Sequence, residues 1–237
     1  MIEVSSASDI GRVRTSNEDS CGVFSPAVSV VADGLGGHAA GEVASRIVVA
    51  AVHDMANAGE PIDTAALKSA VLRANQQVLD AAAKNSAYEG MGSTATVLHI
   101  DEAAQTACYA HVGDSRLYLL RGGELRRISR DHSYVEELVA RGELSEAEAQ
   151  HHPRKNYLLR AVGVEERLHV DGDTFPVMAG DRFLLATDGL TNMVEDADLC
   201  ALLGGNPDDA ARQMVERALD AGGTDNVTAI VIACDPS

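Results

Sequence analysis

The sequence predicts an α+β fold in which two packed antiparallel sheets are covered by helices. Two observations support this fold class. The predicted elements are segregated along the chain: strands come first, then two helices, many strands, two more helices and one last strand. The chain has 237 residues, a length that suits one medium-sized domain. We therefore expect residues 1–237 to form a single domain.

The first third of the chain contains short strands followed by two long helices. Apolar and β-branched residues concentrate in three short runs, and helical periodicity follows in two longer segments. Pro61 and Asp63 mark the start of the second helix. The expected strands are residues 2–8, 20–24 and 28–32, and the expected helices run from about 39 to 56 and from about 64 to 84.

Beyond Gly90 the pattern changes to strands. Gly122 and Gly123 separate two of the runs and predict a hairpin. Residues 132–156 interrupt this rhythm with short, charged helical pieces, which predicts an inserted flap. Further strands are expected at STATVLHI, QTACYAHVG, RLYLLR, ELRRIS, LHVDGDTF, DRFLLAT and NVTAIVIA, with helices near 195–203 and 207–221.

The segment VVADGLGGHAAGE, residues 30–42, allows two interpretations. Its glycines match the phosphate loop of dinucleotide-binding proteins, in which a strand enters a glycine-rich turn and a helix. That motif requires a second strand ending in an acidic residue about 20 residues later. Here a helix is predicted through that region, so we reject the dinucleotide interpretation. The alternative is that Asp33 is a ligand for a cation.

Composition excludes several classes of partner. The chain has 36 acidic and 19 basic residues, a formal net charge of −17, and only 3% aromatic residues. This charge opposes binding to nucleic acid and to anionic membranes, and few aromatic side chains are available to stack on bases. The four cysteines are widely spaced, which suggests neither a zinc site nor a disulfide framework. The first residues show no leader pattern. We therefore expect the protein in the cytoplasm, and we also expect a monomer.

Four aspartates lie where an apolar run meets a predicted turn. Asp33 follows VSVVA, Asp114 follows YAHVG, Asp188 follows FLLAT, and Asp225 shortly precedes VTAIVIA. Each alone is an ordinary turn residue, and Asp171 is expected to be one. Together, at one rim of a sandwich, they would repel one another unless a cation neutralised them. The pattern therefore predicts a metal centre.

The predicted ligands are all oxygens, which select Mg²⁺ or Mn²⁺ over Zn²⁺, and Gly34 is small enough for its backbone carbonyl to reach an ion. Two such ions lower the pKa of a bridging water and stabilise charge on phosphoryl oxygens. Arg14 is the candidate phosphate ligand, because a guanidinium binds two phosphate oxygens. Glu18 and Asp19 are candidates for holding ions through water.

These residues resemble the metal-dependent serine/threonine protein phosphatases of the PPM, or type 2C, family in their compact bacterial form. The resemblance covers nearly the whole chain. It is carried in order by RTSNEDS, VADGLGGHAAGEVAS, GMGSTATV, HVGDSRLYLLRGGEL, DHSYVEELVARGELS, LLATDGLTNMV and GTDNVTAIV.

The resemblance implies a four-layer α-β-β-α sandwich with the metal centre at one end of the two sheets. It also implies roles for individual residues. Asp33, Asp188 and Asp225 would hold one ion, Asp33 and the Gly34 carbonyl a second, Asp114 and Asp188 a third beside the flap, while Asp19 and Glu18 would act through water and Arg14 would take the substrate phosphate.

The sequence departs from the family pattern at two positions. Many relatives carry a histidine directly after the Asp-Gly pair as a general acid, whereas this chain has Leu35, with His38 three residues later as a candidate substitute. Asn156 stands where some bacterial relatives have a hydroxyl in the flap. The flap histidines, His132 with His151 and His152, are expected to be solvated.

The resemblance implies an enzyme that hydrolyses phosphoserine and phosphothreonine in proteins by direct attack of a water bridging two divalent ions. It would oppose bacterial serine/threonine kinases and could act on such a kinase. Two alternatives are a pseudoenzyme that uses the same fold as a binding module, and a two-metal enzyme acting on nucleic acid or a small phosphoester. The filled ligand positions oppose the first alternative, and the net charge of −17 opposes the nucleic-acid form of the second.

Overall fold

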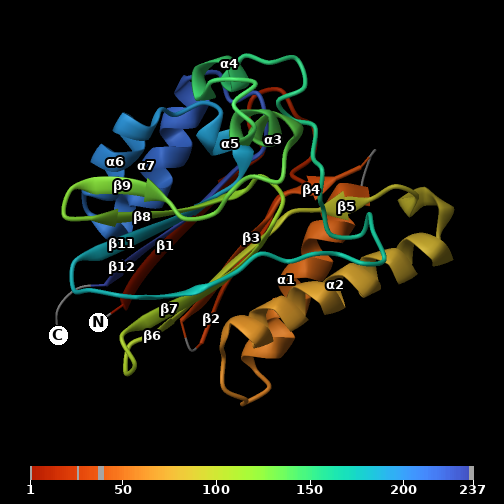
Figure 1. Ribbon diagram of the computed structural model, residues 1–237, viewed down its shortest axis with the longest axis horizontal. Helices are drawn as coiled ribbons and strands as arrows, with labels where there is room; N and C mark the ends of the chain where they lie inside the picture. The colour runs from red at the N-terminus through yellow and green to blue at the C-terminus, as the bar shows by residue number, and fades with distance from the viewer. Residues whose placement is uncertain (1, 26, 37–39, 235–237) are drawn as a thin grey trace.

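The computed structural model describes residues 2–25, 27–36 and 40–234. Two five-stranded antiparallel sheets pack face to face in the middle of the molecule (Figure 1). The first sheet has the strand order β1 (Ile2–Asp9), β12 (Val227–Cys234), β11 (Asp181–Ala186), β8 (Arg116–Arg121), β9 (Glu124–Arg127). The second has the order β10 (Thr174–Pro176), β7 (Thr106–Val112), β6 (Ala95–Asp101), β3 (Val28–Ala32), β2 (Ser20–Phe24).

Helices cover the outer face of each sheet. Helices α1 (Ala40–Ala56) and α2 (Thr64–Lys84) pack on the second sheet, where Val48 and Val71 join the same buried cluster as Val97. Helices α6 (Asp196–Leu203) and α7 (Pro207–Asp220) pack on the first sheet through a second cluster. The predicted four-layer α-β-β-α sandwich is confirmed.

Strand residues alternate between two buried clusters. In β11, Phe183 and Leu185 face the other sheet, whereas Leu184 and Ala186 face the helices. A strand that is buried on both faces needs apolar residues at every position, because successive side chains point to opposite faces. The uninterrupted apolar run of β12, in which all eight residues are buried, has the same cause.

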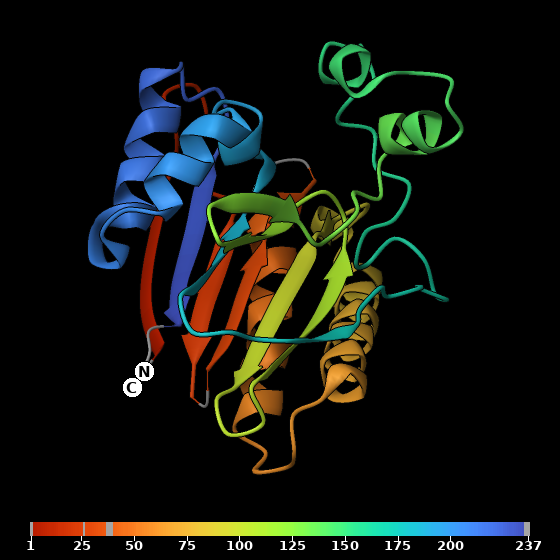
Figure 2. The ribbon, with the colours of Figure 1, turned by 60° about the vertical axis from the view of Figure 1, so that its left-hand side comes forward.

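The segment 132–156 projects from one end of the sandwich (Figure 2). It carries two short helices, α3 (Tyr134–Ala140) and α4 (Glu146–Gln150). The side chains of Ser133 and Ser145 accept hydrogen bonds at the start of these helices, which satisfies exposed backbone donors. The two short helices therefore begin at serine caps that the sequence encodes locally.

Four local features differ from the sequence prediction. The run LHVDGDTF forms a strand only from Thr174, since residues 168–173 cross the edge of the second sheet with a single bridge from Asp171 to His111. Gly34–Leu35 forms a short strand, β4, paired with β5 (Gly92–Ser93). Asp188 begins a short helix, α5 (Asp188–Thr191), and η1 (Ser86–Tyr88) is a 3₁₀ turn.

No helix in the described ranges combines the length and the apolar character needed to cross a bilayer.

Phe183 tests the packing between the sheets. Its side chain is fully buried in the inter-sheet cluster. Phe183→Ala should lower the free energy of unfolding by about 3–5 kcal/mol, because a cavity remains where the ring was. Chemical denaturation measures this change. Val164→Ala, at a side chain that is 62% exposed, is the control and should stay within about 0.5 kcal/mol of the unchanged protein. Equal effects of both substitutions would contradict this packing.

Candidate active site

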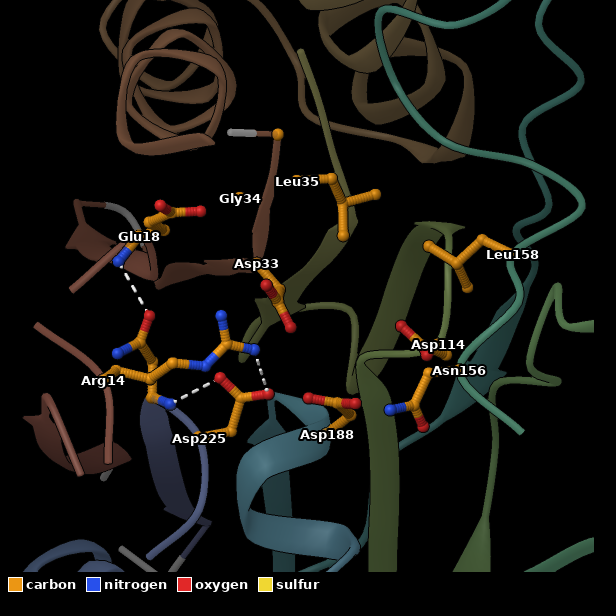
Figure 3. A pocket seen from close by; sticks show the side chains of 12 residues that line it. Arg14, Glu18, Asp33, Gly34, Leu35, Asp114, Asn156, Leu158, Asp188 and Asp225 are labelled. Atoms are coloured by element: carbon orange, nitrogen blue, oxygen red, sulfur yellow. Dashed lines mark hydrogen bonds and ion pairs between the residues drawn. The ribbon is translucent and has the colours of Figure 1, made fainter. Parts of the chain in front are cut away.

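The four strand-end aspartates line one cavity of about 230 Å³ at one end of the sandwich. Figure 3 shows their carboxylates directed into this space. The predicted convergence of Asp33, Asp114, Asp188 and Asp225 is therefore what the structure shows. The cavity is lined by Arg14, Glu18, Asp33, Gly34, Leu35, Gly36, Asp114, Asn156, Leu158, Asp188, Asp225 and Asn226.

Sheet register brings Asp188 and Asp225 together. Strands β11 and β12 are antiparallel neighbours in which Ala186 pairs with Ala229. Asp188 follows the end of β11, and Asp225 precedes the start of β12. The end of one strand and the start of an antiparallel neighbour meet at the same edge of a sheet. The two carboxylates are thus adjacent although 37 residues separate them along the chain, from 188 to 225.

Asp33 reaches the cavity from the second sheet. Its backbone N–H donates to Thr94 Oγ1 at 2.8 Å, and its carbonyl accepts from the N–H of Thr94 at 2.9 Å. The hydroxyl of Ser93 also donates to the carbonyl of Asp33, at 3.0 Å. These bonds fix the main chain of Asp33. Ser93, at the end of β5, and Thr94, directly before β6, therefore position Asp33.

Gly34 lies where the main chain is tightly enclosed. A Cβ at this position would collide with the backbone carbonyls of Gly41 and Glu18. The N–H of Gly34 also donates to the carbonyl of Glu18 at 3.2 Å. Only glycine can occupy this position, because any side chain would collide with these carbonyls. The backbone of Gly34 therefore lines the cavity directly.

Asp19 is buried close to the other acids but is not among the residues that line the cavity. It is 8% exposed, and its Oδ2 accepts from the hydroxyls of Thr187 at 2.8 Å and Thr228 at 2.6 Å. Its Oδ1 is buried with no hydrogen-bond partner among the described atoms. An unsatisfied buried carboxylate oxygen is costly. A divalent cation, reached directly or through water, would satisfy this oxygen, so the donor set fits the predicted metal centre.

Burial and mutual repulsion raise the pKa values of the clustered carboxyls. Burial raises the pKa of Asp19 to about 7. For Asp33, burial and then the charges of Asp19 and Asp188 raise the pKa well above its usual value. Burial followed by the nearest carboxylates likewise raises the pKa of Asp188 and that of Asp114. Such a group of perturbed acids in a cavity is typical of a functional site.

Arg14 supplies positive charge at the edge of the cavity. Its guanidinium donates to Asp225 Oδ2 at 2.8 Å, and the side chain is 52% exposed. Glu18 also lines the cavity, and its burial raises the pKa of its carboxyl. Arg14 is thus placed where a phosphate group entering from solvent would meet it.

The carboxylates surround the cavity without meeting at one point. Among the residues that the structure describes, no three His, Cys, Asp or Glu side chains form a compact group already shaped to hold an ion. The side chains of Asp33 and Asp188 lie within hydrogen-bonding reach of each other, whereas Asp225 is directed toward Arg14. The convergence of the acids is therefore observed, whereas the assignment of individual ligands stays a prediction.

Asn226 is a structural residue of the site whose role the sequence did not reveal. Its side-chain amide donates to the carbonyls of Ile10 and Ser16, both at 2.9 Å. Its side-chain oxygen accepts from the N–H of Glu18 at 2.8 Å. Asn226 thereby ties the segment that carries Arg14 and Glu18 to the turn that carries Asp225. The motif GTDNVTAIV contains Asn226, but only the adjacent Asp225 was recognised, because its carboxylate is a candidate metal ligand.

Two predictions about single residues were wrong, and a third residue is not described. His132 is 5% exposed rather than solvated, because its ring packs beside His111. Asp171 is more than a turn residue, since it accepts hydrogen bonds from His132 and Arg160. His38, the candidate general acid, lies outside the described residues.

Comparison with known proteins agrees with this geometry. The family profile described as Protein phosphatase 2C matches residues 12–227. The chain belongs to the protein phosphatase 2C family. It is 38% identical over 235 residues to the serine/threonine phosphatase Stp of Listeria welshimeri, a match that covers 94% of this chain and 92% of that one.

Solved structures of this family have the same fold. The serine/threonine phosphatase PstP/Ppp of Mycobacterium tuberculosis matches with a TM-score of 0.93 and 35% identity over 99% of both chains. The catalytic domain of PstP in complex with two manganese ions matches with a TM-score of 0.91 and 34% identity, again over 99% of both chains. The protein phosphatase 2C family is metal-dependent, and this chain places its acids accordingly.

The raised pKa of Asp19 predicts a pH-dependent stability. A carboxyl whose pKa rises from about 4 in the unfolded chain to about 7 in the folded protein binds more protons when folded between these values. Its contribution to stability is therefore complete at low pH and is lost as the pH rises toward about 7. In chelator-treated protein, Asp19→Asn should remove this loss.

Melting temperatures of the two chelated proteins check this expectation. The advantage of Asp19→Asn over the unchanged protein should grow from about pH 5 to about pH 8. Comparing the two proteins cancels the titration of groups that do not interact with Asp19, such as the buried His111. Loss of the Asp19 charge also relieves the raised pKa of Asp33, which adds to the advantage of the variant in the same direction. A constant difference across this range would show that Asp19 is ionised throughout.

Proposed function

We propose that this protein is a Mn²⁺- or Mg²⁺-dependent serine/threonine protein phosphatase that hydrolyses phosphoserine and phosphothreonine. The observation that carries the proposal is the gathering of Asp33, Asp114, Asp188 and Asp225 around one cavity that Arg14 enters. Relatives with the same fold are named serine/threonine phosphatases, which supports the same reaction type here.

Asp33, Asp188, Asp225 and the Gly34 carbonyl would hold two divalent ions, with Asp19 and Glu18 contributing through water. When bound, the ions supply an activated water for direct attack and compensate charge on the phosphoryl oxygens. The protein residues hold the carboxylates in place before substrate arrives. Thr94 fixes Asp33, and Thr187 and Thr228 fix Asp19. Asp114 with Asp188 would hold a third ion.

Arg14 would bind the phosphate of the substrate. A guanidinium presents N–H groups in a planar fork that matches two phosphate oxygens. Its present partner, Asp225, is itself a proposed metal ligand. If Asp225 shifted toward an ion, the N–H donors of Arg14 would be released to bind the phosphate. The Arg14 charge would then pair with Asp225 in the metal-free protein and with the substrate phosphate in the loaded enzyme.

Proton donation to the leaving alkoxide is assigned to His38. Leu35, directly after Gly34, lines the cavity with an aliphatic side chain that carries no transferable proton. His38 is three residues farther along the sequence. This assignment rests on sequence position and is tested by the effect of His38→Ala on turnover of substrates with poor leaving groups, where proton donation matters most.

The biological context follows from the reaction type. We place the enzyme in the cytoplasm, as a monomer acting in signal transduction, where it opposes serine/threonine protein kinases and acts on phosphorylated proteins that could include such a kinase. The net charge of −17 favours phosphoprotein substrates over nucleic acid. We further propose that residues 1–237 form one catalytic domain with residues 132–156 as its flap.

Phosphate release from a phosphothreonine peptide tests the function. The purified protein with Mn²⁺ should release phosphate, and a chelator should abolish release. Asp33→Asn and Asp225→Asn should each lower turnover on the order of 100-fold or more, because the loss of ion binding removes several kcal/mol of charge stabilisation. Both variants should stay folded, since each removes one acid from a repulsive cluster.

Asp220→Asn is the matched control, because Asp220 is exposed and lies outside the cavity. It should leave turnover unchanged. No release from either the peptide or an aryl phosphate, with chelation making no difference, would refute the proposed function. Faster turnover of single-stranded DNA than of the peptide would instead indicate a two-metal nuclease.

A further inference from the structure

His132 contacts Gly113 through both its backbone and its ring. Its backbone N–H donates to the carbonyl of Gly113 at 2.7 Å, and its ring Nδ1 accepts from the N–H of Gly113 at 3.1 Å. The ring Nε2 lies 3.0 Å from Asp171 Oδ2. An Nδ1 that accepts from an amide carries no proton, so the proton is on Nε2 and donates to the carboxylate. The partners therefore define one neutral tautomer.

Gly113 is also enclosed on the side that faces Thr94. Its φ of +107° lies in the left-handed region, and a Cβ here would come within 2.5 Å of Thr94 Cγ2. Thr94 also binds the backbone of Asp33 and the hydroxyl of Ser115. Gly113 is thus enclosed between His132 and Thr94, and the next residue is Asp114, whose carboxylate lines the cavity.

His132 also lies where the two ends of the flap meet. Its carbonyl accepts from the N–H of Leu159 at 2.8 Å, and the N–H of Tyr134 donates to the carbonyl of Tyr157 at 2.8 Å. Asn156, at the end of the flap, and Leu158, just beyond it, line the cavity from this returning segment. His132 therefore contacts both the turn that carries Asp114 and the segment that leaves the flap.

We propose that His132 is a positioning residue whose neutral ring and backbone clasp Gly113, and so set the Asp114 carboxylate relative to the cavity-lining end of the flap. Asp171 holds the ring in the required tautomer, and Arg160 orients Asp171 through a 3.0 Å bond to its Oδ1. Burial lowers the pKa of His132, which keeps the ring neutral. The clasp itself is independent of the proposed function, whereas its consequence for metal binding rests on it.

Two substitutions separate the two ring bonds. In His132→Asn the side-chain oxygen stands near the position of Nδ1 and can accept from Gly113, but nothing reaches Asp171. In His132→Gln the side-chain amide stands near the position of Nε2 and can donate to Asp171, but Gly113 loses its acceptor. The structure assigns the positioning role to the Gly113 bond, so the asparagine variant should resemble the unchanged protein more closely than the glutamine variant.

Amide hydrogen exchange measured by NMR is the direct readout, since it needs neither metal nor activity. The Gly113 amide should be protected in the unchanged protein. It should stay protected in His132→Asn and exchange about tenfold faster or more in His132→Gln, as its acceptor is lost. An unprotected Gly113 amide in the unchanged protein, or equal exchange in the two variants, would overturn the clasp.

Mn²⁺ titration followed by calorimetry tests the consequence. His132→Gln should weaken the Mn²⁺ step that Asp114→Asn abolishes, by about tenfold, and shift the Mn²⁺ dependence of phosphate release in the same direction. His169→Gln is the control, because this exposed histidine also contacts Asp171, at 3.3 Å. Unchanged Mn²⁺ binding in His132→Gln would overturn the positioning role. A protected Gly113 amide in a protein without phosphatase activity would refute the proposed function and leave the clasp standing.

Discussion

Repulsion between carboxylates is the constraint on which this end of the molecule depends. Asp33, Asp114 and Asp188 share one cavity with Asp225, and burial raises the pKa of each of the first three. A fold that served stability alone would not keep so many acids together. The crowding is understandable if paired divalent cations complete the site, because their charge turns the repulsion into a strong binding interaction.

The rest of the fold supplies what this arrangement needs. Three buried clusters hold two sheets and two helical layers together, so the strand ends have fixed positions. Antiparallel register brings the Asp188 and Asp225 segments to one edge, and Asn226 fastens the Arg14 segment to them. The loops of the active site are therefore held by the ends of packed strands. This limits how far the site residues must move when substrate and ions bind.

Much of the fold and of the acidic site was predictable from the sequence. The parts that were missed depend on contacts between distant segments of the chain. Apolar runs ended by aspartates revealed both the strands and the acidic centre, because doubly buried strands and turn residues leave strong local signals. The burial of His132 and the contacts of Asp171 were missed, since both depend on chain crossings between residues 113, 132 and 171. Asn226 was missed for a similar reason: its hydrogen bonds span more than 200 residues of sequence.

The central claim is that the gathered aspartates form a centre for two divalent ions. Anomalous scattering from crystals soaked in Mn²⁺ measures this most directly, because it locates each ion independently of the protein model. We expect at least two peaks in the cavity, with Asp33 between them and Asp188 and Asp225 in contact with one. Crystals in which Mn²⁺ binds only outside the cavity, or does not touch Asp33, would contradict the account.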